Sequence, residues 1–213
     1  LQLYGFIAVP DGPLMMTTAL FLLTFKRFSE NRRWAWLWMG VAMALMAYSK
    51  YHGALVVLFA LAVTPPRQFL RPTLYLSALV AAVLLVPLLV WQYDHGWASF
   101  AYHLSGRNSV FRPGYVVEFL ANVLVVFNPF FVPLYVQAWR KVKPQTPVGR
   151  ALKLLPVAFI VFFMLSSLRG YVQPQWVIVS CFGLVCVLFA YARRHPRTRR
   201  YVMRAGGVTV AED

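Results

Sequence analysis

The chain has 213 residues, of which 60% are hydrophobic and only 13% are charged, and its formal net charge is +15. With a mean hydropathy of +0.61, this composition excludes an ordinary soluble domain and is typical of a protein that crosses a membrane several times. The positive charge does not indicate a nucleic-acid partner, because the basic residues lie in short tracts beside long apolar runs.

Eight apolar runs follow one another along the chain, and the first of them is incomplete. They cover residues 1–9, 14–25, 34–49, 53–64, 73–91, 115–139, 152–168 and 176–192. They predict an all-α, polytopic bundle of transmembrane helices with about seven complete spans and one partial span. Because the chain starts without Met inside an apolar run, we expect an N-terminal part to be missing.

The connectors between these runs alternate between basic-rich and basic-poor. Of the 21 Lys and Arg residues, 17 lie in four groups, at 26–33, 67–71, 140–153 and 193–204. The positive-inside rule places these groups in the cytoplasm and the other connectors outside. It also favours two short spans over 34–64, since one merged span would put the basic 140–153 loop outside. We expect a transmembrane domain at 1–192 and a basic cytoplasmic tail at 193–213.

Asp11 lies between two apolar runs, in the sequence Val9-Pro10-Asp11-Gly12-Pro13. Pro10 cannot continue a helix interior, whereas Pro13 suits the first turn of the helix that follows. One interpretation is a helix cap, in which the carboxylate accepts hydrogen bonds from free N–H groups at the helix start. The other is an acid held at the mouth of a membrane-embedded site.

Lys50, Tyr51 and His52 form the turn after the 34–49 run, on the same external face as Asp11. Polar groups are costly at membrane depth unless they line a cavity, so their collection on one face suggests a site. Lys50 could extend to the interface or bind an anion such as a phosphate, with Tyr51 as an aromatic wall. All three are candidate substrate-binding residues.

Two later external connectors are also candidates. From Trp97, apolar residues recur at helical spacing, which predicts a short external helix lying along the interface, and Arg107 beyond it could hold a phosphate. The turn at 169–176 contains Arg169, Gln173, Gln175 and Trp176. This set could hold a sugar by hydrogen bonds and stacking, or it could be an interfacial anchor.

Two features of the second half have a structural interpretation. Asn128, Pro129 and Pro133 interrupt the 115–139 run, which predicts a kinked or broken helix in which Asn128 bonds freed backbone groups. Cys181 and Cys186 are five residues apart and would face different sides of a helix, so we expect no disulfide.

Pro10-Asp11-Gly12-Pro13-Leu14, followed by a span, a basic turn and Ser49-Lys50-Tyr51, resembles a known pattern. It is similar to the dolichyl-phosphate-mannose protein mannosyltransferase (PMT) family, glycosyltransferase family 39, whose members have the GT-C fold and include bacterial relatives. Ala44 stands where that family usually has a second Gly. Residues 173–176 are similar to the family's late external motif, and 91–107 to an external segment of its bacterial members.

The resemblance implies transfer of a sugar from a polyprenyl-phosphate carrier to a lipid, protein or glycan acceptor. The reaction would occur on the periplasmic face of the bacterial inner membrane, with the C-terminus in the cytoplasm. Asp11 would be a supporting catalytic acid and Lys50 would contact the carrier phosphate, with Arg107, Arg169 and residues 173–176 as further contacts. The family's principal acid would precede Leu1, so we expect this chain alone to be inactive. A divalent metal ion is an open alternative, and no other cofactor is implied.

Two other functions stay open from the sequence. A transporter or flippase for a lipid-linked sugar would share the basic external pocket but need no carboxylate base, and a non-catalytic subunit of a membrane complex would need neither. An Asp-Glu pair in a first external loop upstream of Leu1 would favour the transferase.

Overall fold

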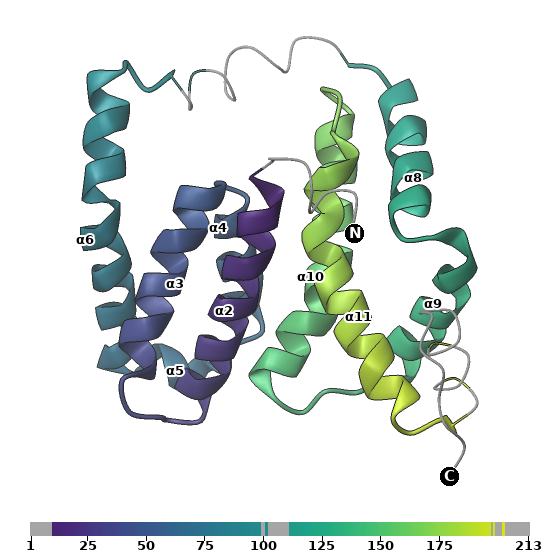
Figure 1. The fold of residues 1–213 in the computed structure, drawn as a ribbon, viewed down its shortest axis with the longest axis horizontal. Coiled ribbons are helices and arrows are strands. Elements are labelled where there is room, and N and C mark those ends of the chain that lie inside the picture. The colour runs from purple at the N-terminus through teal and green to yellow at the C-terminus, as the bar shows by residue number, and fades with distance from the viewer. Residues whose placement is uncertain (1–9, 99–100, 102–110, 197, 199–201, 203–213) are drawn as a thin grey trace.

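The computed structural model describes residues 10–98, 101, 111–196, 198 and 202, and all regular secondary structure within them is helical (Figure 1). The all-α prediction is therefore confirmed. The elements, in chain order, are α2 (Asp11–Ser29), α3 (Ala35–Ser49), α4 (Gly53–Ala62), α5 (Pro66–Phe69), α6 (Pro72–Asp94), α8 (Gly114–Val126), η1 (Pro129–Phe131), α9 (Val132–Lys141), α10 (Pro147–Ser167), η2 (Pro174–Val177) and α11 (Ile178–Ala192).

The described part of the chain has fewer clear membrane spans than the sequence predicted. Three helical segments are long and apolar enough to cross a membrane, at Pro72–Asp94, Pro147–Ser167 and Pro174–Ala192, and the bent pair α8 and α9 would make a fourth. The apolar helices α3 and α4 have only 15 and 10 residues. At 1.5 Å per residue they reach about 22 and 15 Å, short of a hydrocarbon core of roughly 30 Å. The count of seven spans is not confirmed.

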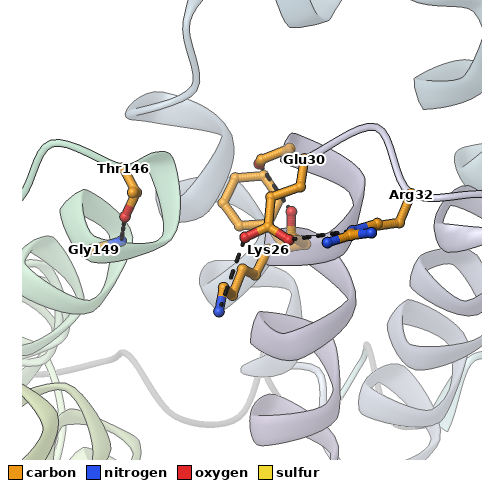
Figure 2. Close-up of polar contacts among 7 residues, drawn as sticks. Lys26, Glu30, Arg32, Thr146 and Gly149 are labelled. Atoms are coloured by element: carbon orange, nitrogen blue, oxygen red, sulfur yellow. Dashed lines mark hydrogen bonds and ion pairs between the residues drawn. The ribbon is translucent and has the colours of Figure 1, made fainter.

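The basic connectors gather at one end of the bundle. In Figure 1 the α2–α3 loop, α5, the α9–α10 loop and the C-terminal end of α11 lie at the bottom, whereas the α3–α4 turn and the α10–α11 connection lie at the top. Figure 2 shows part of the basic end, where the Glu30 Oε1 lies 3.9 Å from the Lys26 Nζ and the Glu30 Oε2 lies 3.8 Å from the Arg32 Nε. Such exposed pairs stabilise the fold little.

The helices pack closely where glycine permits it. A Cβ on Gly40 of α3 would lie 2.5 Å from the carbonyl oxygen of Ser77 and 2.8 Å from the Val80 Cβ, both on α6. The Tyr48 hydroxyl adds a 2.9 Å hydrogen bond to the Leu84 carbonyl. Small residues at helix crossings favour close packing of membrane helices, and here they hold α3 against α6.

The interruption at Asn128 is confirmed. α8 and the segment that begins with η1 meet at 77°, and Asn128 adopts a positive φ of 57°. Its side-chain oxygen accepts a 3.2 Å hydrogen bond from the Phe130 N–H, which is one of the backbone groups freed by the break. Cys181 and Cys186 are both free thiols, as the sequence predicted. Most of the expected interfacial helix and of the C-terminal tail lies outside the described residues.

Candidate functional site

Four segments that are far apart in the sequence line one cavity of about 760 Å³. They are the start of α2, the end of α3 with the turn into α4 and the start of α4, the second half of α6, and η2 with Gln173 before it. Seven of the nine residues singled out in the sequence are among those that line it, namely Asp11, Lys50, Tyr51, His52, Gln173, Gln175 and Trp176. The tertiary structure thus brings residues that are scattered along the sequence together in the wall of one cavity.

An ion pair lies at the polar end of this cavity. The Lys50 Nζ donates to the Asp11 Oδ1 at 2.6 Å, and the two side chains are only 12% and 3% exposed. Asp11 is the first residue of α2 itself, Pro10 takes the N-cap position, and the helix has no side-chain cap. The helix-cap interpretation of Asp11 is therefore wrong. A carboxylate out of water gains more from a full positive charge at contact distance than from backbone dipoles, so Asp11 pairs with Lys50.

Lys50 reaches the cavity because α3 ends there. Its N–H still bonds to the Met46 carbonyl, but its backbone is extended, with φ −171° and ψ 140°, and α4 begins three residues later at Gly53. A Cβ on Gly53 would lie 2.8 Å from the Met46 Cβ, so glycine permits this close turn. The tight connection holds Lys50, Tyr51 and His52 at the ends of two packed helices.

Aromatic rings lie beside the ion pair. The His52 ring centroid lies 4.9 Å from that of Trp176 and 5.1 Å from that of Phe163, which is buried on α10. The Lys50 Nζ lies 5.4 Å from the centre of a Trp176 ring, within the range of a cation–π interaction. Trp176 therefore joins the turn before α11 to the turn between α3 and α4.

Gln173 orders the turn that carries Trp176. Its Oε1 accepts a 2.8 Å hydrogen bond from the Gln175 Nε2 and a 3.1 Å hydrogen bond from the Trp176 Nε1. With both donors satisfied by one acceptor, the indole is held in a defined orientation at the cavity wall. This arrangement agrees with either a sugar-binding turn or an interfacial anchor.

The opposite part of the cavity is apolar. Its wall comes from one face of α3 and one face of α6, with Met43, Ala47, Ala81, Leu85, Leu88 and Leu89. Between Ala81 and the polar Gln92, α6 rises by about 16 Å at 1.5 Å per residue. The cavity is amphipathic along this length, so it suits a ligand with a charged or polar head and an apolar tail.

Two predicted site residues are not part of this wall. Arg169 is exposed in the connection after α10 and is absent from the residues that line the cavity. Arg107 lies outside the described residues. Conversely, the sequence did not single out Gln92, which lines the cavity and is only 5% exposed. A polar residue at the end of an apolar run looks like an interfacial residue, and only the packing of α6 shows that it is buried.

Among the residues that the structure describes, no three His, Cys, Asp or Glu side chains gather in a way that could hold a metal ion. Asp11 is the sole acidic residue among those that line the cavity in this part of the chain. The described site thus consists of one carboxylate, one ammonium group, amides, aromatic rings and an apolar wall.

The comparison with known families agrees with this set of residues. Residues 2–91 match the model of the family described as dolichyl-phosphate-mannose-protein mannosyltransferase. Over this segment the chain is similar to the PMT family. The matched segment contains both members of the Asp11–Lys50 ion pair and almost all of α6, so the resemblance seen in the Pro-Asp and Ser-Lys-Tyr motifs is confirmed. The family indicates a membrane glycosyltransferase, in agreement with the apolar helices. No curated protein and no solved structure matches the chain.

Proposed function

We propose that the cavity of this PMT-like protein holds a polyprenyl-phosphate sugar and that the protein transfers the sugar to a lipid, protein or glycan acceptor. The observation that carries the proposal is a lysine whose side chain is only 12% exposed, at the polar end of a cavity whose long wall is apolar. A phosphate bound at Lys50 would match the polar end of the cavity, and a prenyl chain along α6 would match its apolar wall. We place the reaction on the periplasmic face of a bacterial inner membrane.

Lys50 stabilises the leaving group in this proposal. As the acceptor oxygen forms its bond to the anomeric carbon, the bond from that carbon to the phosphate oxygen breaks and polyprenyl phosphate departs as an anion. An ammonium group has three N–H donors, and Asp11 takes one of them, so two are available for phosphate oxygens. A fixed cation in an apolar surrounding stabilises developing negative charge more strongly than water does.

Asp11 has a supporting role because it is already paired. It holds the Lys50 ammonium in position and offsets its charge in a cavity where an isolated charge would be costly. The acceptor proton would go to the principal acid that the family resemblance places upstream of Leu1. The Trp176 ring, next to Lys50, supplies a face on which a sugar ring can stack.

The test uses the full-length protein with its ion pair removed in two steps. We expect Lys50→Met and Asp11→Asn each to lower sugar transfer from polyprenyl-phosphate donors at least 100-fold. Lys50→Met removes the cation that stabilises the leaving group, and Asp11→Asn removes the carboxylate that holds this cation in position. The double variant Asp11→Asn/Lys50→Met leaves no unpaired charge. It should insert and fold like the wild type and still lack transfer.

The double variant separates function from structure. If the pair only held α2 against the α3–α4 turn, transfer would return when both charges are removed, and the assignment would be wrong. The matched control is Lys26→Met/Glu30→Gln, which removes an exposed pair at the other end of the bundle and should leave transfer unchanged. Carrier binding without any transfer by the wild type would favour a flippase for a lipid-linked sugar.

A further inference from the structure

Another cavity, a groove of about 430 Å³, lies where the long apolar run breaks at Asn128. Its walls are the end of α8, one face of α9 and the middle of α10. The 77° bend between α8 and the segment that begins with η1 places these two segments on adjacent walls. In Figure 1 the bend lies on the opposite side of the bundle from α6. Among the described residues, none lines both this groove and the Asp11–Lys50 cavity.

One face of α9 lines the groove from the first turn of that helix to its last. The residues of this face recur at helical spacing and are Val132, Tyr135, Val136, Trp139 and Arg140. Four of them are aliphatic or aromatic, and Arg140 ends the face in the last turn. The groove is therefore apolar along most of its length and has a cation at one end.

α10 supplies a second face with the same polarity. Val157 and Ile160 line the groove, and Lys153 lies on the same side of α10 as Val157, one turn nearer the start of the helix. The Lys153 Nζ lies 4.7 Å from the centre of a Trp139 ring. Because Arg140 directly follows Trp139 in the chain, Arg140 and Lys153 lie at the same end of the groove.

No acidic side chain neutralises these two cations within the described residues, where the ion pairs involve Asp11 and Glu30. The sequence from residue 119 to residue 196 contains neither Asp nor Glu. The Lys153 Nζ donates a 2.7 Å hydrogen bond to the Val142 carbonyl, which leaves two of its three N–H donors for another acceptor. An anion at this end of the groove would therefore meet positive charge with no carboxylate to compete for it.

The apolar part of the groove is open at its side. Leu124, Val136 and Val157 line it and are 49%, 47% and 41% exposed, so a hydrocarbon chain can enter between them. From Lys153 to Ile160, α10 rises by about 10 Å, which is long enough for several methylene groups of such a chain. The groove thus matches a molecule with an anionic head and an apolar tail.

We propose that this groove binds an anionic phospholipid, with its phosphate at Arg140 and Lys153 and one acyl chain along α9 and α10. The two cations lie at the end of the bundle where the basic connectors gather (Figure 1). Basic pockets between membrane helices bind the head groups of anionic lipids from the leaflet that they face. The inference goes beyond the proposed function and does not rest on it, because the groove is separate from the Asp11–Lys50 cavity.

The test of the head group measures lipid binding to the full-length protein in detergent by native mass spectrometry. The probes are phosphatidylglycerol and phosphatidylcholine with identical acyl chains. The wild type should bind phosphatidylglycerol about tenfold more tightly, and Arg140→Gln/Lys153→Gln should bind both lipids equally. The matched control is Lys141→Gln/Lys143→Gln, which removes the same charge from the same connector at positions that do not line the groove. It should keep the wild-type preference.

Two further variants separate binding from folding. Arg140→Gln alone leaves the bond from Lys153 to the Val142 carbonyl in place, and it should lower the preference for phosphatidylglycerol about fivefold. Val157→Trp fills the apolar part of the groove and should weaken phosphatidylglycerol binding at least tenfold. Its control is Leu165→Trp, at an exposed position of the same helix outside the groove, which should bind normally. Thermal unfolding without added lipid should be the same for these variants and the wild type.

Four outcomes would overturn the inference and leave the proposed function untouched. Equal binding of the two lipids by the wild type would mean that the cations do not select the head group. An equal loss in Lys141→Gln/Lys143→Gln would indicate general charge attraction without a site. Displacement of phosphatidylglycerol by equimolar polyprenyl phosphate would assign the groove to the carrier. Binding of neither lipid by the wild type would show that protein covers the groove.

Discussion

At the scale of single residues, the site depends on one ion pair that is almost fully removed from solvent. Asp11 and Lys50 come from different helical segments and meet at 2.6 Å. A pair of this kind contributes little net stability compared with two apolar side chains, but a single unpaired charge in its place is costly. The pair is therefore better explained by its position in the cavity than by the stability of the fold.

This explanation predicts how stability responds to substitution. Asp11→Asn alone leaves the Lys50 ammonium buried without its partner, and we expect a loss of roughly 3–5 kcal/mol, as for other buried pairs broken on one side. Adding Lys50→Met should restore most of that loss. Thermal unfolding of the purified protein in detergent measures both effects, and a double variant less stable than Asp11→Asn would contradict this account.

The sequence placed Asp11 and Lys50 on one membrane face but did not predict their contact. Two residues lie on the same membrane face when an even number of spans separates them, and the alternation of basic-rich and basic-poor connectors indicates that number. A contact requires the rotation and tilt of the packed helices. For the same reason, Gln173, Gln175 and Trp176 could be proposed as sugar contacts from the sequence, while their place in the same cavity wall came from the structure.

At the scale of elements, the α3–α6 interface supports the cavity. The same two helices supply its apolar wall, so their separation would change the cavity's width. Gly40 is the position at which a side chain would collide with the α6 backbone. The sequence shows this glycine, but it does not show which residues of α6 lie against it. The point where two helices cross depends on how both of them pack.

Gly40→Val should push α3 away from α6. We expect a loss of about 1–3 kcal/mol in the free energy of unfolding, as for other overpacked sites, together with weaker binding of polyprenyl phosphate. Thermal unfolding and ligand titration measure the two effects. Gly114→Ala is the control, since a Cβ there meets nothing within 4 Å. Equal stability of the two variants would show that the crossing tolerates a larger residue.

At the scale of the whole molecule, charge divides the bundle into two ends. The basic connectors meet at the end opposite the Asp11–Lys50 cavity (Figure 1). Anionic lipids and the positive-inside rule favour the cytoplasm for the basic end, which would place the cavity at the external face.

Cysteine labelling tests this orientation. In a background with Cys181 and Cys186 replaced by Ala, Arg169→Cys should react with a membrane-impermeant maleimide added outside intact cells. Gln145→Cys, in the basic α9–α10 loop, should react only after permeabilisation. The reverse pattern would put the cavity in the cytoplasm and exclude a periplasmic reaction.

The sequence by itself determined the helical class, the break at Asn128, the division of charge and the PMT-like pattern. These follow from hydropathy, proline and short motifs, which are local properties of the chain. Only the tertiary structure decided that Asp11 pairs with Lys50 instead of capping α2, and that Gln92 is buried in the wall of the same cavity. The physical reason is that a buried polar group takes its partner from whichever helix packs against it, and that choice is made by the whole bundle.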